Sequence, residues 1–464
     1  MSAVLLLGLG LRIGGSTGEL WLDEIWSLAI ASQLKSASQV FTIHHENNHY
    51  LISFWMLVCG TRHAWWVYRV PSIVAGMGAT LAAIRIGLRQ SRATAFVAGL
   101  LTSLSYLAVF YSSEARGYAI ACCMALVGYD CMETYLRDRN WRSSAGYCFA
   151  VVVGTLGSLT YVNVAAALGV WSLMEMLWRE RTRRSARQFV VLHAAPLALM
   201  VALWLVDVRK MISAPAPQVG IWRVLCETIN YTFGLAASFR LGSALVVIVF
   251  CFIVWRIVSM ARCGDMRWTL FLTGLIVAPA VLIAWTGRQV LYPRYFLVNV
   301  YLLYLLAALE IGEWWDASAR RTRWLIGGAL AGWTLGNLLL SAQLCEVGRG
   351  HYKDALEFIS GNTRGEAARI GSTEDFRTGV LVWYYARYLP AAKRPEVVDV
   401  DSLAQVRPEW LLSTISPYEM PALPPRIALP AGLQYMLVKQ FPSVQLSGFT
   451  AGVYRRADLL NGGK

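Results

Sequence analysis

The chain has 464 residues, of which 56% are hydrophobic and only 15% are charged, and its mean hydropathy is +0.47. Soluble domains carry about 25% charged residues, so this composition excludes an ordinary soluble enzyme and a disordered chain. The formal net charge is +14. On an apolar chain, such an excess indicates either an anionic partner or the orientation signal of a membrane protein, and its placement along the chain decides between them.

Apolar stretches close to the ~20 residues that cross a bilayer recur along the first three quarters of the chain. We predict eleven transmembrane helices, the first of which is interrupted by Arg12. The predicted spans lie at about 1–17, 66–84, 93–111, 117–136, 144–159, 162–178, 188–206, 241–258, 268–286, 295–314 and 324–342.

Five connections between these spans are rich in Arg. They hold 17 Arg and three acidic residues, which accounts for the whole positive excess and leaves none for nucleic acid. Cytoplasmic loops carry such an excess, so we predict a multi-pass protein of the plasma (inner) membrane, surrounded by membrane lipids, with its N-terminus in the cytoplasm. The Arg-rich connections are 85–92, 137–142, 179–187, 256–267 and 320–323.

The other connections are then predicted to lie on the far, periplasmic side. The membrane domain is expected to span 1–342, with outer loops at 18–65, 112–116, 207–240 and 287–294. Residues 343–464 differ in composition, with nine of the 15 Pro and mixed charges. Their short strand-like runs alternate with helical patterns, which predicts a small extracytoplasmic α/β domain with a partly parallel sheet.

The first outer loop contains a formal HExxH pattern formed by His45, Glu46 and His49. In a zinc metalloprotease the two His share one face of a helix and Glu is the general base. Asn47 and Asn48 are poor interior helix residues, and the alternative is a polar segment whose side chains hydrogen-bond backbone groups at the membrane interface.

Four short motifs occur in order on the predicted outer side: WLDE at 21–24, NNHYLISFW at 47–55, YSSEARGYA at 111–119 and PRYF at 293–296. Together they resemble the GT-C glycosyltransferases, and are most similar to family 39 and the aminoarabinose-transferase-like group, which includes enzymes like the dolichyl-phosphate-mannose mannosyltransferases. Tyr50 stands where that group usually has Pro.

The resemblance implies an all-α polytopic fold and an enzyme that moves a hexosyl or pentosyl group, with inversion, from a polyprenyl-phosphate-linked sugar donor. The acceptor would be extracytoplasmic: a glycolipid such as lipid A, a polysaccharide or a protein. A lipid-linked sugar transporter or flippase is the alternative class. Transporters usually place ionisable residues near the middle of the membrane and contain repeats, whereas the predicted spans are nearly free of charge at their centres.

Asp23 is the candidate general base, because an acceptor hydroxyl must lose its proton as it attacks. The alternative role for Asp23 is the N-cap of a helix over 24–33. Glu24 would orient the acceptor, bind a divalent cation or simply favour the N-terminus of that helix. The sequence leaves open whether a cation takes part.

The leaving group is a lipid phosphate, whose developing charge should meet cationic side chains. Arg294 and Arg116 are the main candidates, because the orientation rule disfavours Arg on this side; the alternative for each is an ion pair with an acid such as Glu114 or Asp23. The full set of candidate residues for binding the substrate and the carrier phosphate is Arg294, Arg116, Tyr292, Tyr295, Arg288, Glu114, His49 and Asn48.

Overall fold

The computed structural model describes residues 1–212, 219–286, 291–365, 367–416, 419–420, 422–429 and 432–460. The chain divides into two compact units. The membrane unit comprises Met1–Ser16 and Ala31–Ala342, and the C-terminal unit comprises Thr17–Ile30 and Gln343–Lys464. The first part of the predicted outer loop 18–65 therefore folds with the C-terminal residues.

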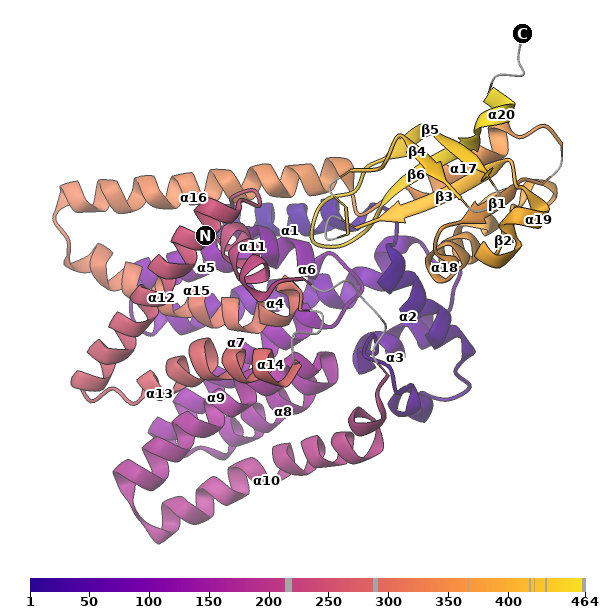
Figure 1. Ribbon diagram of the computed structural model, residues 1–464. Helices are drawn as coiled ribbons and strands as arrows, with labels where there is room; N and C mark the ends of the chain where they lie inside the picture. Colours follow the sequence, from indigo (N-terminus) through magenta and orange to yellow (C-terminus); the bar gives the residue numbers. More distant parts are fainter. Residues whose placement is uncertain are drawn as a thin grey trace. The chain divides into compact units, whose positions relative to one another are not determined.

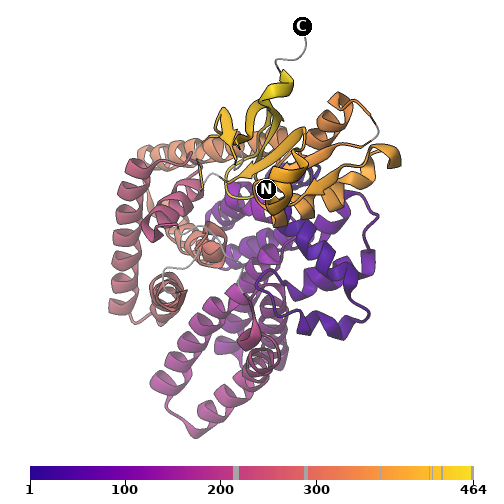
Figure 2. The same cartoon turned by 45° about the vertical axis from the view of Figure 1, so that its right-hand side comes forward.

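The membrane unit is built from helices that run alongside one another (Figure 1; Figure 2). In chain order they are α1 (Ser2–Ser16), α3 (Tyr50–Cys59), α4 (Trp65–Leu88), α5 (Arg92–Leu104), α6 (Tyr106–Ser112), α7 (Tyr118–Asp138), α8 (Trp141–Gly157), α9 (Val162–Leu173), α10 (Arg183–Val206), α11 (Ile221–Thr232), α12 (Phe239–Arg262), α13 (Arg267–Leu272), α14 (Ala278–Thr286), α15 (Leu297–Ala317) and α16 (Arg320–Val347). Shorter 3-10 and π turns continue several of them.

Within the described residues, eight helical segments of at least 18 residues are apolar enough to cross a membrane. They become nine if α5 and α6, which meet at 54°, form one bent span. The two shorter helices α1 and α8, of 15 and 17 residues, coincide with the remaining predicted spans. Each of the eleven predicted spans therefore falls on a helix, and the predicted polytopic helical fold is confirmed.

Burial separates central from peripheral helices in this unit. The span that contains α15 is 83% buried, whereas those of α10 and α12 are 17% and 22% buried. Both peripheral helices expose long aliphatic and aromatic side chains, among them Val191 on α10 and Phe250 on α12. A helix that is apolar on its exposed face is suited to contact lipid.

The bend between α5 and α6 has a local cause at Ser105. This residue leaves the helical conformation, with φ −55° and ψ 130°, and its hydroxyl accepts a hydrogen bond from the backbone N–H of Ala108. The freed N–H of Tyr106 is satisfied by the Oδ1 atom of Asn337, at 2.7 Å. Buried backbone groups need such partners when a helix is interrupted inside a membrane.

The C-terminal unit contains one six-stranded sheet in the order β2-β1-β3-β6-β5-β4. Strand β1 pairs in parallel with β2 and β3, with Ile370 opposite Val397 and Trp410, while the remaining pairs are antiparallel. The partly parallel sheet is therefore confirmed. Its strands are β1 (Arg369–Ser372), β2 (Glu396–Val398), β3 (Trp410–Ile415), β4 (Arg426–Ala428), β5 (Gln434–Phe441) and β6 (Thr450–Arg456).

Helices pack around this sheet. Helix α17 (Tyr352–Asn362) packs on β5 and β6, and α18 (Asp375–Tyr385) packs on β2 and β3. Helix α2 (Leu22–Gln33) begins in the same unit and touches α18, because the ring of Trp26 meets that of Phe376 edge to face at 4.7 Å between centroids. The short helices α19 (Leu403–Val406) and α20 (Ala457–Leu460) flank the sheet.

Candidate active site

The HExxH pattern lies in a tight turn. His45 forms a single bridge with Ile212 and its Nδ1 accepts a hydrogen bond from the Asn47 N–H, at 3.0 Å. The helix α3 begins only at Tyr50, so His45 and His49 do not share a helical face, which a metalloprotease of this type requires.

Asp207, at the end of α10, holds this turn in place. The buried carboxylate accepts a 2.6 Å hydrogen bond from His44 Nδ1 and a 2.7 Å bond from the hydroxyl of Tyr50. Tyr50, where the resembling group usually has Pro, thus anchors the start of α3 through its side chain. Sequence reasoning missed Asp207, although an acid at the end of an apolar span is the signal that would have singled it out.

Asn48 has a structural role in the turn. Its amide nitrogen donates to the carbonyl oxygen of Val40 at 2.8 Å, and its side-chain oxygen accepts from the hydroxyl of Ser53 at 2.8 Å. Asn47 instead reaches Arg116, whose Nη1 donates to the Asn47 Oδ1 atom. The side chain of Asn48 therefore stabilises the turn, whereas that of Asn47 orients the guanidinium of Arg116.

Arg116 lies in the short connection between α6 and α7 and is only 2% exposed. Its backbone N–H donates to the carbonyl of Glu114 at 2.8 Å, and its Nη2 donates to the hydroxyl of Tyr118 at 3.4 Å. The carbonyl of Arg116 accepts from Ser72 of α4 at 2.9 Å. Glu114 is fully buried in the same turn.

His49 lies beside this cation and is 6% exposed. Its Nδ1 is 3.0 Å from the carbonyl oxygen of Gly157, so Nδ1 carries the proton and donates, and Nε2 is left as an acceptor. Within the described ranges Nε2 is buried and has no hydrogen-bond partner. Burial, with Arg116 and Arg294 nearby, lowers the pKa of His49 well below its usual value.

The hydrogen bond between His49 and Gly157 depends on a close contact between the start of α7 and the end of α8. A Cβ atom at Gly117 would lie 1.7 Å from the Gly157 oxygen and 3.0 Å from His49 Nδ1. Only glycine lets the start of α7 approach the end of α8 so closely. Tyr118, the next residue, packs its ring edge to face against His49 at 4.8 Å.

Arg294 follows Pro293 in the short PRYF turn before α15. Its guanidinium lies 4.4 Å from the ring centroid of Tyr292 and 5.6 Å from that of Tyr295. Tyr118 and Glu46 are among the groups that act electrostatically on Tyr295. The structure thus brings together the NNHYLISFW motif, the YSSEARGYA motif and the PRYF turn. Arg288 lies outside the described residues.

Asp23 and Glu24 belong to the C-terminal unit. Helix α2 begins at Leu22, so Asp23 lies in its first turn and is half-buried rather than serving as the residue before the helix. Glu24 is fully buried, and its Oε2 atom accepts a hydrogen bond from the Trp21 N–H at 3.1 Å. Capping its own helix is therefore a role the structure shows for Glu24.

No model of a known protein family matches the sequence, and no curated protein is significantly similar to it. Solved structures do match. The apo structure of ArnT from Cupriavidus metallidurans superposes with a TM-score of 0.56 at 14% identity, covering 100% of this chain and 98% of ArnT. The chain has the GT-C fold.

A second GT-C structure agrees. The apo oligosaccharyltransferase of Archaeoglobus fulgidus matches with a TM-score of 0.50 and 12% identity, over 85% of this chain and 64% of that protein. ArnT of Cupriavidus metallidurans has also been solved with undecaprenyl phosphate bound. Within this fold, Arg116 and Arg294 both lie close enough to His49 to lower the pKa of its imidazole.

Proposed function

We propose that this protein is an inverting membrane glycosyltransferase, which transfers a sugar from a polyprenyl-phosphate carrier to an acceptor outside the cytoplasm. The observation that supports it best is the cluster of Arg116, Arg294 and neutral His49, lined by tyrosines and set in the loops of a GT-C fold. Two guanidinium groups with aromatic neighbours suit a lipid phosphate, since Arg binds phosphate oxygens through paired N–H groups.

The buried turn around Arg116 supports the leaving-group assignment. Asn47 and Tyr118 hold the guanidinium in one orientation, so little reorganisation is needed when charge develops on the phosphate. Arg294 is fixed in a similar way by Tyr292 and Tyr295. In the proposed reaction the acceptor oxygen forms a bond to the anomeric carbon, the bond to the phosphate oxygen breaks, and the carrier leaves as a phosphate monoester.

Asp23 is the proposed general base that takes the acceptor proton. Glu24 is fully buried, whereas Asp23 is half-buried, so Asp23 is the carboxylate of the pair that an acceptor can reach more easily. Within the described residues, no group of three His, Cys, Asp or Glu side chains is arranged to hold a metal ion, and no step of the proposal passes through one.

The deciding experiment uses the full protein in lipid nanodiscs, with a panel of short polyprenyl-phosphate sugars and cell-envelope acceptors. Asp23→Asn should lower transfer by about 10²–10⁴-fold while binding of polyprenyl phosphate stays within twofold of the unsubstituted protein. The matched control is Asp354→Asn, an exposed acid on α17 of the same unit. Full transfer by the Asp23 variant would overturn the base assignment.

The same preparation tests the alternative class. Movement of the labelled carrier across a bilayer without cleavage of the sugar–phosphate bond would favour a transporter and contradict a transferase. Arg294→Gln and Arg116→Gln should each weaken polyprenyl phosphate binding by about tenfold or more, the equivalent of one charge-assisted hydrogen bond. Mass spectrometry of envelope glycans and glycolipids from a deletion strain would identify the acceptor.

A further inference from the structure

A cavity of about 220 Å³ lies at the end of the membrane unit where the Arg-rich connections gather. Its walls come from the ends of α4, α7, α12 and α15 and from the start of α13, so it is far along these helices from the PRYF turn that precedes α15. Its polar lining contains three Arg and three Glu, with Gln90 and Tyr129. These charged residues are Arg89, Arg256, Arg267, Glu133, Glu310 and Glu313.

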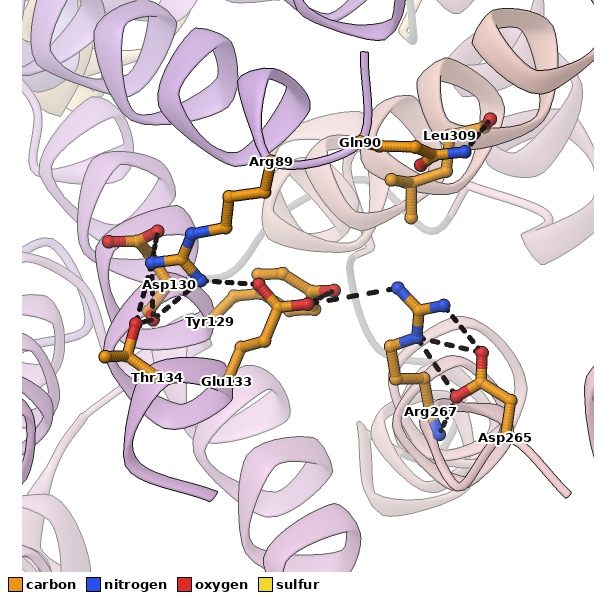
Figure 3. Close-up of polar contacts among 9 residues, drawn as sticks. All are labelled: Arg89, Gln90, Tyr129, Asp130, Glu133, Thr134, Asp265, Arg267 and Leu309. Atoms are coloured by element: carbon orange, nitrogen blue, oxygen red, sulfur yellow. Dashed lines mark hydrogen bonds and ion pairs between the residues drawn. The ribbon is translucent and has the colours of Figure 1, made fainter. Parts of the chain in front are cut away.

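Most of the charged lining is already paired, as Figure 3 shows for one side of the cavity. Arg89 lies 2.6 Å from both the Glu133 and the Asp130 carboxylates. Arg267 bonds Asp265 at 2.7 Å, and its Nη1 lies 3.9 Å from Glu133 (Figure 3). These ion pairs neutralise the partly buried charges and join the ends of α4 and α7 to the start of α13.

Arg256 and Glu313 each leave a polar group of the lining available for a ligand. Arg256 pairs with Glu310 through Nη2, but its Nε is buried and has no hydrogen-bond partner within the described ranges. Glu313 is exposed, and neither a hydrogen bond nor an ion pair joins it to any part of the chain that the structure describes. The cavity therefore offers a donor on the Arg256 cation and the carboxylate of Glu313 to a ligand.

Neighbouring tryptophans place the cavity at the depth of lipid headgroups. Trp255 and Trp314 are 50% and 40% exposed, their ring centroids are 6.2 Å apart, and each directly adjoins a lining residue of its own helix, Arg256 or Glu313. Exposed Trp residues concentrate at the interface between the hydrocarbon and the headgroups. Ile86, Met260 and Leu309 supply apolar lining, which suits the upper part of an acyl chain.

We propose that this cavity binds the headgroup of a zwitterionic aminophospholipid, with its phosphate at Arg256 and its primary ammonium at Glu313. The six charged lining residues carry no net charge, and Asp130 and Asp265 add two further carboxylates nearby. An anionic headgroup gains no net electrostatic attraction from a lining without net charge. A zwitterionic headgroup, by contrast, can bind Arg256 through its phosphate and Glu313 through its ammonium group. The assignment does not depend on the transferase proposal.

The test is native mass spectrometry of the full protein with phospholipids of identical acyl chains. Phosphatidylethanolamine should bind about tenfold more tightly than phosphatidylcholine, because the quaternary ammonium of phosphatidylcholine has no N–H to donate. A tenfold difference corresponds to about one charge-assisted hydrogen bond. Glu313→Gln should reduce that preference to about twofold or less. Asp316→Asn, an exposed acid three residues further along α15 that does not line the cavity, is the matched control.

Other results would overturn the proposal. Equal binding of the two zwitterionic lipids, tighter binding of phosphatidylglycerol, or equal behaviour of the Glu313 and Asp316 variants would each contradict it. Arg256→Lys keeps the positive charge beside Glu310 but loses the Nε donor, so it should weaken the binding of phosphatidylethanolamine and phosphatidylcholine to the same extent. Soluble glycerophosphoethanolamine at the lipid concentration should not displace the lipid; displacement would assign the site to a soluble zwitterion instead.

Discussion

At the scale of single residues, the buried imidazole of His49 is a proposed ligand contact. Its Nδ1–H donates to the carbonyl oxygen of Gly157. Its Nε2 is a buried acceptor without a hydrogen-bond partner in the part of the chain that the structure describes, and a donor such as a hydroxyl would satisfy it. Leaving such a buried atom without a partner costs about 1–3 kcal/mol. That cost is consistent with a position kept for binding rather than for stability.

The lowered pKa of His49 predicts how stability changes with pH. The unfolded chain binds a proton near pH 6.5, whereas burial and the two Arg residues keep the folded imidazole neutral well below that value. Stability is therefore full above about pH 6.5 and falls as the pH decreases below it. His49→Asn keeps an amide donor for Gly157, and its Tm should fall less between pH 7 and pH 5 than that of the unsubstituted protein.

The control for this measurement is His63→Asn, because His63 is exposed in the loop before α4. Its Tm should follow the pH dependence of the unsubstituted protein. If the His49 variant loses as much stability on acidification as the His63 variant does, His49 is not the titrating group.

At the scale of elements, Glu19 links the segment before α2 to α17. Its Oε2 atom accepts hydrogen bonds from the backbone N–H groups of Tyr352, at 2.5 Å, and Lys353, at 2.9 Å, which are the first N–H groups of that helix. The hydroxyl of Tyr385 also donates to the carbonyl of Leu20 at 2.7 Å. These bonds explain why residues 17–30 fold with the C-terminal unit.

Glu19 gives the C-terminal unit a pH dependence of the opposite sign. Burial raises the pKa of Glu19 to about 7, although the N–H groups of α17 act against that shift. A raised acid pKa contributes stability that is fully present below about pH 4.5 and is lost as the pH rises through 7. Glu19→Gln keeps an acceptor oxygen for α17 but carries no charge. At pH 8 this variant should therefore have a higher Tm than the unsubstituted protein, with a free energy of unfolding larger by up to about 3 kcal/mol.

The pH series decides whether charge is the cause. The difference in Tm between Glu19→Gln and the unsubstituted protein should shrink towards pH 5, where both side chains are neutral in the folded state. Glu357→Gln, which removes an exposed carboxylate on the same helix, should change the Tm little at either pH, since surface pairs contribute about 0–1 kcal/mol. A gap that is constant with pH would contradict the assignment.

At the scale of the whole molecule, the Arg-rich connections predict the orientation in the membrane. Exposed Arg side chains crowd the turn between α9 and α10 and the first turns of α10, at Arg181, Arg183, Arg184 and Arg187. An alkaline phosphatase reporter, which is active only outside the cytoplasm, should be active when fused after residue 464 and inactive when inserted in that turn. The reverse pattern would contradict the predicted cytoplasmic N-terminus and extracytoplasmic C-terminal domain.

The amino-acid sequence by itself determined the helical spans and the GT-C resemblance, because length and hydropathy alone decide which segments can lie in lipid. It also indicated Asp23, Arg116 and Arg294 as polar residues that a membrane protein needs a reason to keep. It could not indicate that Asp207 holds His44, that Gly157 holds His49 or that Asn47 orients Arg116, since those contacts join segments up to 163 residues apart. Nor could it show the short strands β1 and β4, whose residues form strands only by pairing.

The tertiary structure also changed the meaning of the basic residues. In the sequence, Arg89, Arg256 and Arg267 count only as part of an orientation signal. In the fold each is paired with an acid, and those acids include Glu133 and Glu310 from apolar spans. Hydropathy is a property of each segment alone, so it predicts the spans; a buried charge depends on a partner from another helix, so only the packed bundle decides its role.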